Sequence, residues 1–257
     1  MVLFTALGTL SVSDGDRAWA PSSPKLRQIL ALLLSRANHV VTFEAMMEEL
    51  WDADRPKTAL TTAQTYVYQL RKAICREVSP EVMPLTRPSG YLLPLGPEQR
   101  FDVQVFQDLA GEGRRLLLEG AYEQASRQLS RALDLWAGEP MADVPCGPLL
   151  TAYAVHLEEQ RLHALELRIE ADLRLGRHRE LIGELKSLVT VHPHHEWFHG
   201  RLISALTRSG RRSEALQAYR TVRAILSDDL GLDPSQELQE LQQAVLTTGS
   251  TPARWAV

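Results

Sequence analysis

The stretch TALTTAQTYVYQLRKAI, from Thr58 to Ile74, has the spacing of an amphipathic helix with an unusual polar side. Its apolar residues recur at intervals of three and four, which predicts one buried stripe made of Leu60, Ala63, Val67, Leu70 and Ile74. The other side is rich in threonine, glutamine and tyrosine. Threonine is a mediocre helix former, so this composition indicates a surface that faces something other than water.

Charge around this helix points to a polyanion. The segment from Arg55 to Arg76 contains five Lys and Arg residues and no acid, although the whole chain has a net charge of −4. Threonine can contact phosphate or a thymine methyl group, glutamine can pair with adenine, and tyrosine can reach the sugar–phosphate backbone. The helix by itself leaves two interpretations open, a DNA major-groove helix and a surface helix of odd composition.

The flanking sequence favours the DNA interpretation. Short strands are expected in residues 1–20, followed by a helix in PKLRQILALLLSRAN and a short helix, FEAMMEELW, capped by Thr42. After the third helix, MPLTRPSGYLLPL reads as a β-hairpin with its turn at residues 88–90 and Arg87 beside the turn. A helix–turn–helix followed by a hairpin is the plan of a winged helix, and an arginine at the hairpin tip can enter a minor groove or hold a phosphate.

From Phe101 onward the strand signals disappear and long amphipathic helices follow. Gly176 and Gly210 begin similar segments 34 residues apart, which is the period of tetratricopeptide repeats, and Gly120 begins a third segment of the same kind. Between Gly120 and Gly176, the segment GEPMADVPCGPLL is rich in Pro and Gly and is expected to be a loop.

Composition excludes several other classes of protein. The 257 residues contain no run of about 18 apolar residues and no basic leader before an apolar segment, so we expect a cytoplasmic protein without a membrane segment or signal peptide. Cys75 and Cys146 are expected to be reduced thiols. Motifs of the types GxxxxGK[ST], GxSxG and CxxC are missing. His195 and His199 have metal-ligand spacing, but no further ligand completes a site. We therefore expect no enzyme, no cofactor and no metal.

Two sets of segments together resemble the Streptomyces antibiotic regulatory protein family. PKLRQILALLLSRANHVVTFEAMMEELW, ALTTAQTYVYQLRKAI and TRPSGYLL look like its OmpR-type winged helix. RALDLWAGEPMADVP, ALTRSGRRSEALQAYRTVRAIL and DDLGLDPSQELQELQQAVL resemble its bacterial transcriptional activation domain. The resemblance covers roughly residues 1–246 in the expected order, and the chain is similar to the small, stand-alone members.

The resemblance implies a fold that is mainly α with a small β part. Residues 1–97 would form an OmpR-like winged helix-turn-helix, residues 98–250 an all-α tetratricopeptide-like activation domain, and residues 251–257 a flexible tail. It implies an activator of an antibiotic gene cluster that works on nucleoid DNA in the cytoplasm. Its partners would be promoter DNA with direct repeats, RNA polymerase holoenzyme and a second protomer placed head to tail on the same face of the DNA.

Carried over by position, the resemblance also assigns DNA contacts. The residues in or beside the major groove would be Thr61, Thr62, Gln64, Thr65, Tyr68 and Gln69. Arg71 and Lys72 would meet phosphates, and Arg87 would belong to the wing. The connection REVSPEVMPLTRP departs from the family, because it lacks an expected glycine and carries Glu77 and Glu81. A protein-binding adaptor whose winged helix has lost DNA remains the alternative, although an adaptor has no need to exclude acids from this helix.

Overall fold

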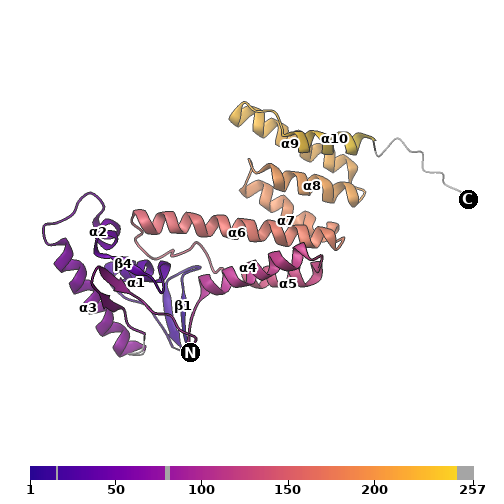
Figure 1. Ribbon diagram of the computed structural model, residues 1–257. Helices are drawn as coiled ribbons and strands as arrows, with labels where there is room; N and C mark the ends of the chain where they lie inside the picture. Colours follow the sequence, from indigo (N-terminus) through magenta and orange to yellow (C-terminus); the bar gives the residue numbers. More distant parts are fainter. Residues whose placement is uncertain (16, 79–81, 248–257) are drawn as a thin grey trace, which may run out of the picture. The chain divides into compact units, whose positions relative to one another are not determined.

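The computed structural model describes residues 1–15, 17–78 and 82–247, and these described residues form two compact units, one that ends at residue 168 and one that begins at residue 169. The division falls within one long helix (Figure 1). The predicted class, mainly α with a small β part and a winged helix followed by tetratricopeptide-like helices, is confirmed. The predicted boundary between residues 97 and 98 stays a prediction.

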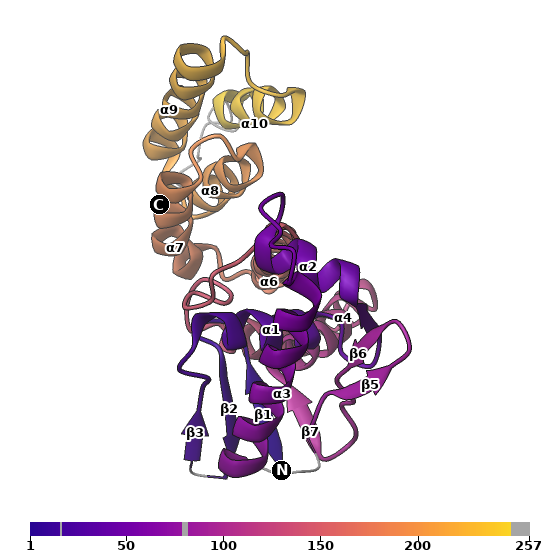
Figure 2. The ribbon, with the colours of Figure 1, turned by 90° about the vertical axis from the view of Figure 1, so that its left-hand side faces the viewer.

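A four-stranded sheet opens the first unit. It contains β1 (Val2–Thr5), β2 (Ser11–Asp14), β3 (Arg17–Trp19) and β7 (Gln99–Phe101), in the order β3-β2-β1-β7 (Figure 2). The first three strands are antiparallel, as expected for closely spaced strands, whereas β7 is parallel to β1. The strand β7 was not predicted. It brings the end of the winged-helix segment back to the beginning of the chain.

Three helices follow the first three strands of this sheet in the chain: α1 (Pro24–Ser35), α2 (Phe43–Trp51) and α3 (Ala59–Glu77). Pro24 starts α1, where its missing N–H is not needed. The hydroxyl of Thr42 accepts a hydrogen bond from the Ala45 amide at 3.2 Å, so the predicted cap of α2 is confirmed. Nearly every residue of α1 from Leu26 to Leu34 is buried, so α1 is the central helix of this unit.

The predicted hairpin is present and belongs to a second sheet. The strands β5 (Leu85–Arg87) and β6 (Gly90–Leu92) pair around a two-residue turn, and β4 (Val40–Thr42) pairs with the other edge of β6. A Cβ atom at Gly90 would lie 1.9 Å from the Val41 carbonyl oxygen. Only glycine therefore permits this close pairing of β6 with the strand that leads into α2.

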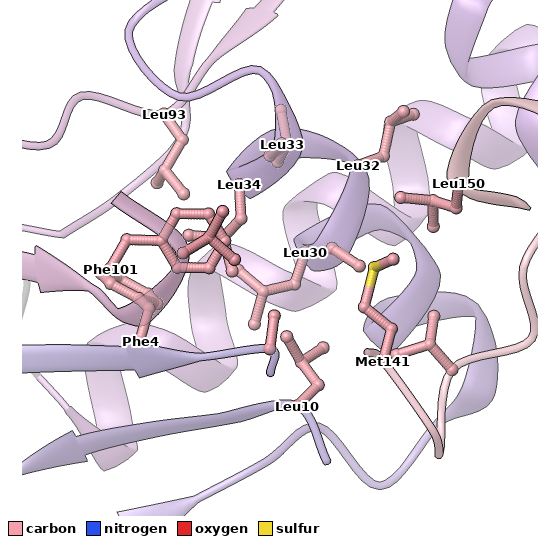
Figure 3. Packing of buried hydrophobic residues seen from close by; sticks show 14 of the residues in the cluster. Phe4, Leu10, Leu30, Leu32, Leu33, Leu34, Leu93, Phe101, Met141 and Leu150 are labelled. Carbon is pink, nitrogen blue, oxygen red and sulfur yellow. The ribbon is translucent and has the colours of Figure 1, made fainter. Parts of the chain in front are cut away.

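The core of the first unit extends well past residue 97. Figure 3 shows Phe4 and Phe101 beside Leu34 of α1, and Met141 and Leu150 near the same helix. All five side chains are at most 2 % exposed and belong to one hydrophobic cluster. Residues of the predicted winged helix and residues beyond it thus share a single core, which is buried largely around α1.

The helices α4 (Asp102–Leu118), α5 (Tyr122–Leu133) and α6 (Pro148–Arg174) complete the first unit and lead into the second. The buried carboxylate of Asp102 accepts hydrogen bonds from the Ala6 and Leu7 amides at 2.8 to 3.0 Å, beyond the end of β1. Burial raises the pKa of Asp102, and the backbone hydrogen bonds act in the opposite direction. This contact joins the start of α4 to the first sheet.

The segment between α5 and α6 is a loop, as predicted, but it is packed rather than solvated. Its amides donate to the turn after β1: Ala137 to the Leu7 carbonyl at 2.7 Å, and Met141 to the Ala6 carbonyl at 2.8 Å. Met141 is buried and has a φ of 55°. These contacts satisfy backbone groups that would otherwise be costly to bury, so the loop is part of the unit.

Glu49 of α2 caps the N-terminus of α6 from about a hundred residues away in the chain. Its buried carboxylate accepts hydrogen bonds from the Gly147 amide at 2.5 Å, the Leu149 amide at 2.9 Å and the Leu150 amide at 3.0 Å. Gln28 of α1 donates to the same carboxylate at 3.0 Å. A negative group at a helix N-terminus is favourable, and here that group belongs to the helix–turn–helix segment.

The second unit continues with α7 (His178–Val191), α8 (Glu196–Arg208), α9 (Arg212–Leu230) and α10 (Gln236–Thr247) (Figure 1). Phe198, Leu202 and Leu206 of α8 are buried, as are Tyr219 and Val222 of α9. Among the described residues, no helix is long and apolar enough to cross a membrane.

The three repeat glycines take the same backbone conformation. Gly120, Gly176 and Gly210 each have a φ of 78° and follow the ends of α4, α6 and α8. The residue after each glycine donates its amide to the carbonyl five residues earlier, which is the Schellman ending of a helix. The repeat predicted from the glycine spacing is thereby confirmed.

We expect Glu49→Ala to lower the free energy of unfolding by at least about 3 kcal/mol, because several buried donors lose a charged acceptor. Urea unfolding measures this change. Glu48→Ala is the matched control, because the half-buried Glu48 side chain makes no hydrogen bond or ion pair within the described residues, and its effect should stay within about 0.5 kcal/mol. Equal effects of the two substitutions would show that the cap does not stabilise the fold.

Candidate nucleic-acid interface

The buried side of α3 differs from the predicted stripe at one end. Ala63, Val67, Leu70 and Ile74 are buried as predicted, but Leu60 is 42 % exposed and Ala59 takes the inward position instead. Residues 59 and 60 both lie about one turn before Ala63, at spacings of four and three, so periodicity alone could not choose between them. Leu60 therefore stands at the surface at the beginning of the helix.

The exposed side of α3 contains most of the predicted contact residues. Thr61, Gln64, Thr65, Tyr68, Gln69 and Lys72 are exposed, and Thr62 is half-buried. Tyr68 is 65 % exposed, so its ring and hydroxyl are accessible to a partner. We call Thr61, Gln64, Thr65, Tyr68, Gln69 and Lys72 the polar face of α3; it contains no acid.

Hydrogen bonds within α3 restrict what its threonines can offer. The Thr65 hydroxyl donates to the Thr61 carbonyl at 2.9 Å, one turn earlier. The hydroxyl hydrogen of Thr65 is thus committed, while its methyl group and an oxygen lone pair remain available to a partner. For Thr65, contact with a thymine methyl group suits this geometry better than donation to a base.

Arg71 connects α3 to the hairpin. Its Nε donates to the Pro84 carbonyl and its Nη2 to the Thr86 hydroxyl, both at 2.8 Å. Its guanidinium lies 5.3 Å from the ring centre of Tyr91 in β6. These contacts give Arg71 a positioning role that its sequence neighbours did not suggest. Its predicted contact with phosphate stays a prediction.

The hairpin presents Arg87 at the surface. Arg87 precedes the turn of Pro88 and Ser89, and its exposed guanidinium donates to the neighbouring Thr86 carbonyl at 3.2 Å. The turn itself is held by the Phe43 amide, which donates to the Ser89 carbonyl at 2.9 Å. The hairpin, which we call the wing, is thus tied both to α3 and to the start of α2.

Two of the five cations near α3 are paired with acids, which a count of charges in the sequence does not show. Arg55 pairs with Glu44 of α2, and the Arg76 Nε lies 2.6 Å from the Glu77 carboxylate. Lys57 and Lys72 make no ion pair within the described ranges of the chain. Because Glu44 precedes Arg55 by eleven residues, a local count of charges misses this pair.

The other predicted features add no site. Glu81 of the unusual connection lies outside the described residues. His199 is buried in α8, and its Nε2 lies 2.9 Å from the Pro193 carbonyl, so its ring is held within the second unit. Burial lowers the pKa of His199. Cys75 and Cys146 are both free thiols, and the described part of the chain holds no group of three potential metal ligands.

Two family profiles match most of the chain. The bacterial transcriptional activator domain matches residues 101–246, and the domain described as transcriptional regulatory protein, C terminal, matches residues 20–93. The second match covers α1, α2, α3 and the wing, and the first covers the helices from α4 to α10.

Individual proteins are similar over nearly the whole chain. The regulatory protein DnrI of Streptomyces peucetius is 41 % identical over 247 residues, which cover 93 % of this chain and 90 % of DnrI. The regulatory protein AfsR of Streptomyces griseus is 36 % identical, with 98 % of this chain but 25 % of AfsR covered. The structure of Mycobacterium tuberculosis EmbR in complex with a low affinity phosphopeptide has a TM-score of 0.89 and 33 % identity, over 96 % of this chain and 65 % of that chain.

Proposed function

This chain belongs to the Streptomyces antibiotic regulatory protein family of transcriptional regulators, and from that premise we propose that it activates transcription by binding specific promoter DNA. In this proposal α3 enters the major groove with its polar face, and the wing contacts the adjacent backbone or minor groove. The family consists of regulators rather than enzymes, in agreement with the sequence prediction.

The observation that carries the proposal is the acid-free polar face of α3. An ordinary exposed helix face is more stable with Glu, Lys and Ala than with Thr, and a carboxylate would repel phosphates. Gln64, Gln69 and Tyr68 provide long polar side chains for base edges and the backbone. Thr61 and Thr65 provide short side chains that allow the helix to approach closely.

We assign the positively charged contacts by their pairing. Lys72 and Arg87 are exposed and are not ion-paired within the described residues, so they are available for phosphates or the minor groove. Arg71 acts mainly by holding the wing at a fixed distance from α3. Thr62 is half-buried and supports the helix beside the groove.

The further partners follow from the family. Two protomers would bind direct repeats head to tail, each with one α3 in the major groove on the same face of the DNA. The helices after residue 101 would contact RNA polymerase holoenzyme or the second protomer. The likeness to DnrI suggests that the controlled genes are an antibiotic gene cluster, and the protein would act on nucleoid DNA in the cytoplasm without a cofactor.

Footprinting of the promoters beside its own gene tests the proposal. We expect protection of two direct repeats on one face of the DNA, with centres about one helical turn, or 10 to 11 base pairs, apart. In vitro transcription with RNA polymerase holoenzyme should then increase from the protected promoter. A lack of any protected repeat would favour the adaptor alternative, and protection without increased transcription would refute activation but not DNA binding.

Base reading by Thr65 has its own test. Thr65→Ala should lose about 1 kcal/mol or more of discrimination at one base position. Thr65→Val, which keeps the methyl group, should retain most of it, whereas Thr65→Ser should not. Competition binding against operators with each base pair replaced measures the profile. An unchanged profile in Thr65→Ala would mean that Thr65 does not read bases.

Salt dependence separates paired from unpaired cations. Lys72→Gln and Arg87→Gln should each reduce the slope of log K against log salt by about 0.9, as expected for one lost phosphate contact. Arg55→Gln should reduce it much less, because Glu44 already pairs with Arg55. Fluorescence anisotropy at several salt concentrations measures the three slopes. If all three substitutions have the same effect, the ion pairs within the protein do not decide which cations meet DNA.

A further inference from the structure

A pocket of about 380 Å³ lies in the first unit, and no described residue of α3 or the wing lines it. Three parts of the chain line it: the end of α1 with the turn that follows, the junction of β7 and α4, and Tyr153 and His156 of α6. Its volume is within the range of small-molecule sites. Nothing in the proposed DNA contacts uses it.

The floor of the pocket is apolar. Leu34 at the end of α1, Phe101 at the end of β7 and Val103 in α4 are all buried in the core and show one side to the pocket. The half-buried ring of Tyr153 from α6 joins them. Burial is the main reason that the pKa of Tyr153 rises to about 12, so its phenol stays neutral. The floor therefore suits a flat apolar group.

The rim of the pocket offers Arg36 and His156 as hydrogen-bond donors. Arg36 is exposed, and among the described residues no ion pair to it occurs. The Nδ1–H of His39 donates to the Ala37 carbonyl at 3.0 Å, which uses the N–H of the ring and leaves its Nε2 as an acceptor. His156 Nε2 lies 2.8 Å from the Gln160 amide nitrogen, which leaves the Nδ1 of His156 as a donor.

The charge that favours an anion in the pocket is that of Arg36. No Asp or Glu of the described residues lines it. The buried acid Asp102 accepts hydrogen bonds from the Ala6 and Leu7 amides, and its charge is the second cause of the raised pKa of Tyr153 in the pocket floor. The first turn of α4, with Val103 and Gln104 on the pocket wall, adds the positive end of a helix dipole, and the end of α1 on another wall adds a negative end, so Arg36 carries the preference for an anion.

From this combination we propose that the pocket binds a small organic anion, with a carboxylate or similar group at Arg36 and a flat apolar body on Leu34, Phe101 and Tyr153. Such a ligand touches α1, α4 and α6 at once. It therefore stabilises the folded chain by binding it in preference to the unfolded chain. The site is independent of the proposed DNA contacts, so its test needs no operator.

Calorimetric titration of the full chain with 1-naphthoate tests the proposal, with neutral 1-naphthamide and with acetate as comparison probes. We expect saturable binding of 1-naphthoate at one site and a higher melting temperature. The amide should bind about tenfold more weakly because it lacks the charge, and acetate should not bind measurably because it lacks the apolar body. A lack of saturable 1-naphthoate binding, or equal affinity for the amide, would overturn the proposal.

Substitutions locate the binding. Arg36→Gln should weaken 1-naphthoate binding about tenfold, and Gln104→Trp should abolish it by filling the pocket from an exposed position of α4. Arg127→Gln on α5 is the matched control and should leave the affinity unchanged. Arg36 is exposed, so Arg36→Gln should fold even if Gln104→Trp does not. Unchanged affinity in Arg36→Gln, or an equal loss in Arg127→Gln, would place the binding elsewhere.

Discussion

The burial of α1 on nearly all sides is the constraint on which the first unit depends. A helix without a polar face is stable only when other elements cover it completely. Here the first sheet, α3 and the loop before α6 all contribute to that cover, and their side chains meet in one cluster. The winged helix of this chain is therefore not a separate small core, because Met141 and Leu150 complete it from beyond residue 97.

Buried carboxylates fix the positions of the helices around this shared core. Asp102 ties the start of α4 to the end of β1, and Glu49 ties the start of α6 to α2. Apolar contacts alone would tolerate a shift of these helices, whereas a buried carboxylate needs its donors at hydrogen-bond distance. The helix that precedes α3 is thus joined rigidly to the helix that leads into the repeats.

In the proposed DNA surface, some residues fix the position of the wing and others stay exposed for contact. Arg71 and Gly90 set the position of the wing, through hydrogen bonds and through a close backbone approach that leaves no room for a Cβ atom. The side chains offered to DNA, such as Tyr68 and Lys72, stand on the opposite side of α3 from its buried stripe. A rigid support with a row of exposed polar side chains is what precise contact with a groove requires.

The sequence by itself determined the features that depend on near neighbours. These are the helices, from their apolar spacing; the cap at Thr42; the hairpin around Pro88 and Ser89; and the repeat turns at the three glycines. It also determined that the polar face of α3 carries no acid. Only the tertiary structure decided that Ala59 rather than Leu60 is buried, that Arg55 pairs with Glu44 and that Arg71 is hydrogen-bonded to the wing. The same is true of the pairing of β7 with β1 and of the cap that Glu49 provides for α6. The physical reason is that each of these depends on which distant groups compete for the same partner or the same buried space, and local spacing carries no information about that competition.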